Sequence, residues 1–183
     1  MPCQSAAAAF VRSGGRLIRG PLNARKGLRI AAVADAQGAA LGLTNRGPRI
    51  AAPGGTALHD WLWMEYVAQE PDRALAFYAD VLGYRHEVSE TREGFTYYVF
   101  ATDRPRAGLF KTLWARHTSA WLPYVRVADP AATAARVEQL GGTVVIPPQP
   151  RVRNNSLAIV LDPSGAPLAL QKFPFDQNTG GIP

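Results

Sequence analysis

An internal repeat constrains the fold of this chain more than any other feature of its sequence. Residues 63–83 can be compared without gaps with residues 121–141, and seven of 21 positions are then identical. The identical pairs are Trp63/Trp121, Tyr66/Tyr124, Val67/Val125, Ala74/Ala132, Ala76/Ala134, Leu82/Leu140 and Gly83/Gly141. Each copy starts with the aromatic and β-branched residues of a strand and continues into a helix, where Pro71 and Pro130 suit the first helical position.

A second, longer shift relates the N-terminal region to the end of the chain. Residues 14–43 match residues 141–170 at ten of 30 positions, again without gaps. Both stretches contain the sequence Asp-x-x-Gly-Ala, once from Asp35 and once from Asp162. Asp and Gly with this spacing are typical of a tight turn between two strands.

The two shifts predict an α+β chain built from βαβββ units. Residues 58–112 form one complete unit and residues 120–173 a second, whereas residues 1–50 form a partial unit with a helix and three strands but no first strand. The expected elements are strands at 60–68, 84–89, 95–102, 106–112, 121–127, 143–147, 156–161 and 166–172, and helices at 71–82 and 130–140. A linker rich in Gly, Pro and Ala runs to residue 57, and residues 174–183 form a tail.

Composition and charge argue against several classes of protein. Hydrophobic residues make up 47% of the chain, but no apolar run approaches the roughly 20 residues of a membrane-spanning helix. Cys3 is the single cysteine, which excludes a disulfide or a thiolate metal site within one chain. The net charge of +6 comes mainly from residues 1–50, which contain eight basic side chains and one acidic side chain. Such a segment could contact nucleic acid, but we rank this interpretation below small-molecule binding.

The motifs resemble those of the vicinal-oxygen-chelate superfamily, which includes glyoxalases, bleomycin-resistance proteins and dioxygenases. The resemblance rests on Trp63-Met64-Glu65-Tyr66, on Pro71 to Tyr78, on Val81-Leu82-Gly83-Tyr84, on Leu140-Gly141-Gly142 and on Asp162 to Ala166. It implies that residues 58–173 form one domain, in which tandem units build a curved mixed sheet with helices on its outer face. The concave side of such a sheet forms a small-molecule cavity. Some members act through a divalent metal, and others bind drugs without one.

The positions that hold metal ligands in enzymes of this superfamily hold none here. By the resemblance, the first-strand His falls on Trp63 and Trp121, and the last-strand Glu falls on Ala169. Indole and methyl groups cannot replace the N and O donors that such metals need. The remaining candidates are single or adjacent residues, namely His59, Asp60, His86, Glu87 and His117. We therefore predict no metal and no other cofactor, with a divalent metal on an unrecognised set of ligands as the alternative.

Aromatic side chains are predicted to line the cavity instead. Alternation along the first strand puts Trp61, Trp63 and Glu65 on one face. The other candidates are Tyr97 (or its neighbour Tyr98), Phe110, Trp114 and, from the second unit, Trp121. Large rings with a few polar groups suit a planar or apolar ligand, although the same rings could simply fill the space of a metal and its substrate.

Glu65 is the candidate catalytic residue, because a carboxylate in such a cavity can serve as a general base. The structural alternative is a carboxylate that is paired with an Arg or hydrogen-bonded to the backbone. We therefore predict a glyoxalase-like cytoplasmic protein that binds a small apolar or aromatic molecule without a metal. The alternative is a lyase, isomerase or oxygenase that uses a metal or Glu65.

The partial unit carries a prediction of its own, because a unit without its first strand has an open sheet edge. Either the sequence begins downstream of the natural start, or the partial unit packs against a second copy in a homo-oligomer such as a dimer. A membrane partner is not expected.

Overall fold

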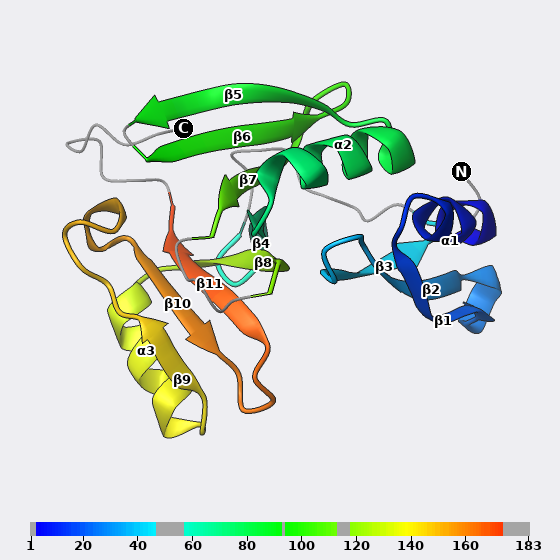
Figure 1. Ribbon diagram of the computed structural model, residues 1–183. Helices are drawn as coiled ribbons and strands as arrows, with labels where there is room; N and C mark the ends of the chain where they lie inside the picture. The colour runs from blue at the N-terminus through cyan, green and yellow to red at the C-terminus, as the bar shows by residue number, and fades with distance from the viewer. Residues whose placement is uncertain (1–2, 47–56, 93, 113–117, 174–183) are drawn as a thin grey trace. The chain divides into compact units, whose positions relative to one another are not determined.

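Helices and strands follow the predicted βαβββ order twice (Figure 1). The structure is a computed structural model, and it describes residues 3–46, 57–92, 94–112 and 118–173. The first repeat consists of β4 (Trp61–Ala68), α2 (Pro71–Leu82), β5 (Arg85–Arg92), β6 (Phe95–Ala101) and β7 (Pro105–Lys111). The second repeat consists of β8 (Ala120–Val127), α3 (Pro130–Gln139), β9 (Thr143–Ile146), β10 (Leu157–Leu161) and β11 (Pro167–Lys172). These bounds confirm the α+β class and the predicted order of elements.

The chain divides into two compact units that do not coincide with the repeats. One unit contains residues 1–49 and 65–121, and the other contains residues 50–64 and 122–183. The N-terminal segment and most of the first repeat therefore belong to the same compact unit.

The first repeat contributes four strands in the order β5-β6-β7-β4. Strand β4 runs parallel to β7, with Glu65 opposite Gly108, whereas the other two pairings are antiparallel. This arrangement is mixed because α2 carries the chain from β4 to the far edge before the strands return.

Helix α2 begins and ends where the sequence predicts. Pro71 occupies its first turn, and Gly83 ends it with a φ of 67°, a left-handed conformation that a side chain would disfavour. The helix buries one apolar stripe, made of Ala74, Leu75, Phe77, Tyr78 and Val81. Burial of two aromatic rings on this stripe is the main contribution of α2 to the core.

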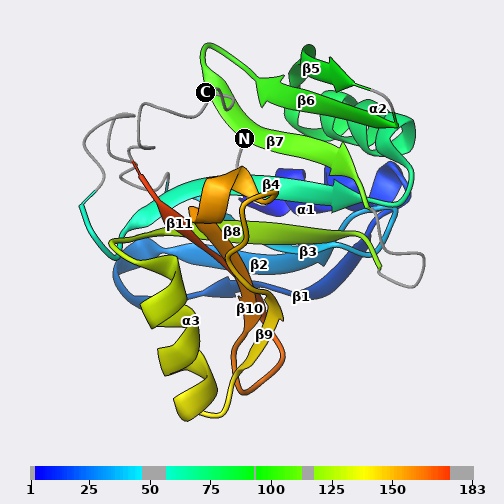
Figure 2. The ribbon, with the colours of Figure 1, turned by 90° about the vertical axis from the view of Figure 1, so that its left-hand side faces the viewer.

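The second repeat contributes four strands in the order β8-β11-β10-β9, with β8 parallel to β11. The Asp129 carboxylate accepts hydrogen bonds from the backbone of Ala131 and Ala132, and so caps the start of α3. Helix α3 packs against β9, β10 and β11 (Figure 2). The buried core beneath it consists of Val127, Ala134, Ala158, Val160 and Leu170.

The N-terminal segment contains one helix and three strands, namely α1 (Cys3–Arg12), β1 (Arg16–Asn23), β2 (Arg29–Ala34) and β3 (Ala40–Thr44). Phe10 is fully buried, and its ring meets the rings of Phe77 and Tyr78 at centroid distances of 5.3 and 6.4 Å. The strand order is β1-β2-β3, so no fourth strand from the described residues covers β3. A strand from a second copy at this edge therefore stays a prediction.

Cys3 is buried in α1 as a free thiol. No helix within the described ranges is long and apolar enough to cross a membrane.

Candidate functional site

Three of the predicted site residues, Glu65, Tyr97 and Phe110, lie on one face of the first repeat. The Tyr97 hydroxyl donates a 3.0 Å hydrogen bond to Glu65 Oε1. Glu65 is only 1% exposed, so its carboxylate lies inside the protein and not on the surface. A Cβ atom at Gly108 would collide with the Tyr97 hydroxyl, because the ring lies directly over the β7 backbone. Gly108 thus provides the space that lets Tyr97 reach Glu65.

Tyr97 belongs to a cluster of three aromatic rings on this face. Phe110 is its cross-strand partner, and the two rings are stacked at 6.4 Å with an interplanar angle of 19°. Phe95 lies 6.5 Å from Tyr97 at an interplanar angle of 23°, and 6.0 Å from Phe110 at 39°, so the three ring centres form a triangle. The three rings are partly buried, and the buried Glu65 carboxylate lies beside them through its bond with Tyr97. We call Glu65, Phe95, Tyr97 and Phe110 the aromatic face.

The remaining first-strand candidates lie further along β4. Alternation keeps Trp61 and Trp63 on the Glu65 side of this strand. Trp61 is 68% exposed, whereas Trp63 is half-buried. Trp114 lies outside the described residues.

Trp121 occupies a different place from the one that the sequence predicts. Its ring lies 5.0 Å from Tyr66 and 5.4 Å from Tyr78, and its Nε1 donates a 3.0 Å hydrogen bond to the Tyr78 hydroxyl. Tyr78 belongs to α2, so Trp121 packs on the helix side of the strands. Tyr66 alternates with Glu65 along β4 and therefore faces the side opposite the aromatic face. Trp121 is part of the core beneath α2 and not of the predicted cavity lining.

A one-residue error in the repeat alignment explains this difference. Glu65 pairs with Gly108 in the first repeat, and Tyr124 pairs with Ala169 in the second. Glu65 and Tyr124 therefore correspond, at a shift of 59 and not 58 residues. Pro71 and Pro130, which both start helices, are also 59 residues apart. Because faces alternate with a period of two, the shift of 58 assigned the wrong face to the start of β8.

The corrected alignment leaves the ligand positions of the superfamily without metal donors. Trp63 now corresponds to Leu122, and the last-strand positions are Gly108 and Ala169. These residues do not fit a divalent metal, because they offer no N or O donor from a side chain. Within the described ranges, no three or more His, Cys, Asp and Glu side chains are grouped so that they could hold a metal.

The histidines that were named as candidate metal ligands lie in different surroundings. His86 is exposed and lies 6.0 Å from the Tyr98 ring, while the His59 backbone N–H bonds to the Arg126 carbonyl. His117 lies outside the described residues.

A buried polar network surrounds Asp35, and the sequence alone did not predict it. The Asp35 carboxylate is 4% exposed and accepts hydrogen bonds from the backbone of Gln37 and Ala39 and, at 2.7 Å, from the Tyr78 hydroxyl. Burial, followed by the charge of Asp35 and this hydrogen bond, raises the pKa of Tyr78 above its ordinary value of 10.0. Burial and the same carboxylate raise the pKa of Tyr66. Both phenols therefore stay neutral at physiological pH.

Gln37 extends this network to the start of α2. Its side-chain amide donates to the Glu70 carbonyl at 2.8 Å and accepts from the Glu70 N–H at 3.0 Å. Ser119 donates to the same amide oxygen at 2.8 Å. The turn motif from Asp35 was visible in the sequence, but nothing local indicated which segment would cover it.

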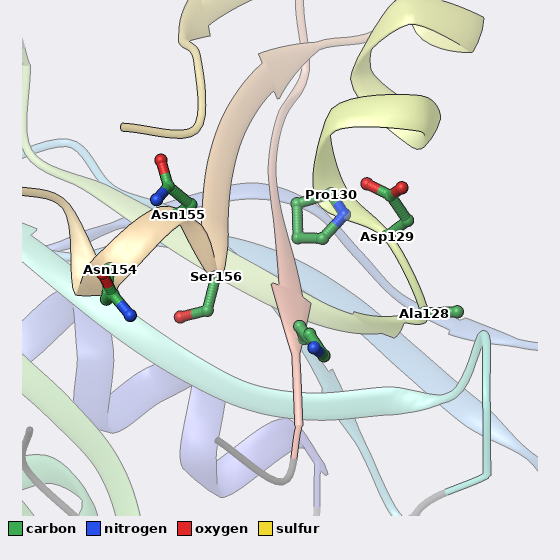
Figure 3. A pocket seen from close by; sticks show the side chains of 7 residues that line it. Ala128, Asp129, Pro130, Asn154, Asn155 and Ser156 are labelled. Carbon is green, nitrogen blue, oxygen red and sulfur yellow. The ribbon is translucent and has the colours of Figure 1, made fainter. Parts of the chain in front are cut away.

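A separate small pocket lies in the second repeat. Figure 3 shows it between the start of α3 and the segment before β10. Its volume is about 290 Å³. Its lining residues are Ala128, Asp129, Pro130, Asn154, Asn155, Ser156 and Lys172. None of the predicted site residues lines it.

Comparison with known proteins agrees with this fold. The glyoxalase-like domain family matches residues 61–171. CFP32 of Mycobacterium bovis and Mycobacterium tuberculosis, named for a proposed glyoxylase activity, is 30% identical over 163 residues. The match covers 88% of this chain and 62% of CFP32, so the chain spans less than two thirds of that relative.

A solved structure supports the same architecture. The 2,2',3-trihydroxybiphenyl 1,2-dioxygenase from Sphingomonas wittichii matches with a TM-score of 0.50 at 13% identity, over 92% of this chain and 65% of the enzyme. This likeness concerns the fold alone. The family match over most of the chain shows that the chain belongs to the glyoxalase-like domain family.

Proposed function

We propose that this protein binds a small, flat, apolar or aromatic molecule on the aromatic face, without a metal. The observation that supports this proposal is the cluster of three partly buried rings, Phe95, Tyr97 and Phe110, next to the buried Glu65 carboxylate. Flat apolar surface gains free energy when a planar ligand covers it, and a single polar group can orient that ligand. The missing metal donors at the superfamily positions favour binding without a metal over metal-dependent chemistry.

A neutral fluorescent probe, N-phenyl-1-naphthylamine, tests this proposal directly. We expect its fluorescence to rise on binding to the full chain, and Phe110→Ala to weaken binding about tenfold, since it removes roughly 1–2 kcal/mol of ring contact. Tyr98→Ala is the matched control, because Tyr98 lies on the opposite face of β6, next to His86. Equal binding by both variants would place the ligand elsewhere.

A second function is favoured by the Glu65–Tyr97 pair itself. A buried carboxylate that accepts a hydrogen bond from a phenol can take up or release a proton, as a lyase or isomerase requires. Glu65→Gln keeps the shape of the side chain but removes this capacity. If a substrate of the glyoxalase type is turned over, we expect this variant to bind it with a similar Kd and to lose turnover. Turnover by the variant at the original rate would exclude Glu65 as the base.

A further inference from the structure

The last strand of the N-terminal segment lacks a neighbour that the last strand of each repeat has. Strand β7 pairs in parallel with β4, the first strand of its repeat, and β11 pairs in parallel with β8. Strand β3 is likewise the third strand after a helix, but among the described strands it pairs with β2 alone. One edge of β3 is therefore not covered by any described strand of the same chain.

Backbone groups of β3 point to this open edge at every second residue. The Asp35 N–H donates to the Ala39 carbonyl at 3.0 Å, and the Asn45 N–H donates to the Arg29 carbonyl at 3.3 Å. These two bonds determine which residues of β3 bond to β2, because bonded and non-bonded pairs alternate in an antiparallel ladder. The residues whose N–H and C=O groups point to the open edge are all exposed, namely Ala40, Gly42 and Thr44.

Three other strands lie at sheet edges in the described part of the chain, and each has a feature that discourages pairing with another chain. Strand β5 contains the charged residues Arg85, Glu87 and Glu90, β9 is only four residues long, and β1 contains Pro21 and two irregularities of register. Charges, prolines, short length and irregularities all protect an edge from edge-to-edge association. Strand β3, with the sequence Ala-Leu-Gly-Leu-Thr, is regular and uncharged and has no such protection.

We propose that the open edge of β3 binds a second copy of this chain, whose own β3 pairs with it in antiparallel orientation about a two-fold axis at Gly42. In this register Gly42 lies opposite Gly42 of the partner subunit, and Ala40 lies opposite Thr44 of the partner subunit. Each outward N–H then meets an outward C=O, because the same three residues supply both sides of a two-fold interface. The facing side chains are small and uncharged, so neither bulk nor like charge opposes the pairing. The segment is thus complementary to itself, which favours a second copy over an unrelated strand.

Gly42 is a position at which this pairing can be changed without a change in the fold. A Cβ atom added there meets no described atom within 4 Å, and its φ lies outside the left-handed region, so the single chain does not require glycine. In the two repeats, the residues at the corresponding position of the last strand pair with the first strand, as Gly108 does with Glu65 and Ala169 with Tyr124. A side chain at residue 42 should therefore affect the contact with the partner subunit and not the packing of one chain.

Sedimentation velocity of the full chain across the micromolar range tests the proposal. The salt concentration should be about 0.15 M, which screens the basic side chains of the two N-terminal segments from each other. We expect a reversible equilibrium of monomer and dimer, because a five-residue edge buries less area than a permanent interface. A chain that stays monomeric at all these concentrations would overturn the proposal.

Variants at Gly42 then test the register. Gly42→Lys and Gly42→Glu should each weaken the dimer about threefold or more, because two like charges would lie directly opposite each other at the axis. A mixture of the two variants should restore the dimer, since Lys would then lie opposite Glu. Failure of the mixture to form a dimer would exclude pairing at Gly42.

Thr143→Lys is the matched control, because Thr143 is an exposed residue of the edge strand β9. It should leave the dimer unchanged. Dimers that are equally stable in Gly42→Lys and Thr143→Lys would show that the interface lies elsewhere. Circular dichroism spectra identical to those of the unmodified chain check that each variant is folded.

Discussion

The Tyr78 hydroxyl, on α2, donates a 2.7 Å hydrogen bond to Asp35 Oδ2, in the turn between β2 and β3. These residues are 43 positions apart, and their bond joins the N-terminal segment to the first repeat. The same turn motif occurs at Asp162 in the second repeat, where its carboxylate is exposed and bonds to Ser164 and Ala166 within the turn. The same turn motif therefore has two roles, and the burial of its carboxylate determines which role it has.

Replacement of Asp35 should destabilise the protein far more than replacement of Asp162. Asp35→Ala leaves the Tyr78 hydroxyl and two backbone N–H groups without their acceptor, and we expect it to lower the free energy of unfolding by about 3 kcal/mol. Asp162→Ala removes the acceptor of exposed turn groups, which can bond to water instead. It should therefore lower the free energy of unfolding much less than Asp35→Ala does. Urea unfolding of both variants measures the difference. Equal losses would show that the buried bond to Tyr78 contributes nothing.

The two buried tyrosines should respond differently to loss of their hydroxyls. Tyr78→Phe removes the donor to Asp35 and the acceptor of Trp121 Nε1, and should cost about 1–3 kcal/mol. The Tyr66 hydroxyl is buried but makes no well-formed hydrogen bond to a described residue, so Tyr66→Phe should be nearly neutral. Thermal unfolding of the two variants is a direct comparison. A larger loss in Tyr66→Phe than in Tyr78→Phe would contradict the network as described.

Stability should fall at alkaline pH. Burial raises the pKa of Tyr66, Tyr78 and Tyr84 in the folded protein above their ordinary value of 10.0, while the unfolded chain keeps that value. The stabilisation is therefore complete below about pH 10 and is lost as the pH rises further, because the unfolded chain releases these protons first. Unfolding by urea between pH 8 and pH 11 measures the slope. Tyr78→Phe removes one of the three groups and should make the decline shallower.

The contact between α1 and α2 should contribute strongly to stability. Phe10 is fully buried against Phe77 and Tyr78, and Phe10→Ala should lower the free energy of unfolding by about 3 kcal/mol. The neighbouring Val11 is 49% exposed, so Val11→Ala is the control and should change little. If Phe10→Ala unfolds at the same urea concentration as the control, the N-terminal segment is not part of the core of the first repeat.

Metal removal should have no effect. Protein that is purified without chelator is expected to contain no stoichiometric divalent metal, because the superfamily positions hold Trp63, Leu122, Gly108 and Ala169. Elemental analysis, with thermal unfolding before and after treatment with EDTA, measures this. About one equivalent of a divalent metal would favour the enzymatic alternative.

The sequence predicted the elements well because their signals are local. The prolines at the starts of α2 and α3, the glycines after them and the Asp-x-x-Gly turns each act within a few residues. The faces of the strands were harder to predict. Identity between Leu82-Gly83 and Leu140-Gly141 fixed the alignment at the helix ends, but α3 is shorter than α2, so the strands before the helices are displaced by one residue. The spacing of Pro71 and Pro130 was the signal that could have corrected it.

The candidate site was predictable only in part. Glu65, Tyr97 and Phe110 were expected to share a cavity face, and the structure brings them together because their strands are neighbours with a simple register. The role of Asp35 could not be inferred, since it depends on a residue far away in the chain. Its carboxylate is buried and accepts a hydrogen bond from Tyr78 of α2.

The burial of Asp35 and Phe10 bears on where the domain begins in this chain. The family match begins at residue 61, yet the compact unit that contains most of the first repeat reaches back to α1. A protein cut at residue 61, where the family match begins, would lose Phe10 and Asp35, and so would expose Phe77 and Tyr78 to water. The family match and the packing thus place the start of this domain differently, and the N-terminal segment contributes to the core of the first repeat.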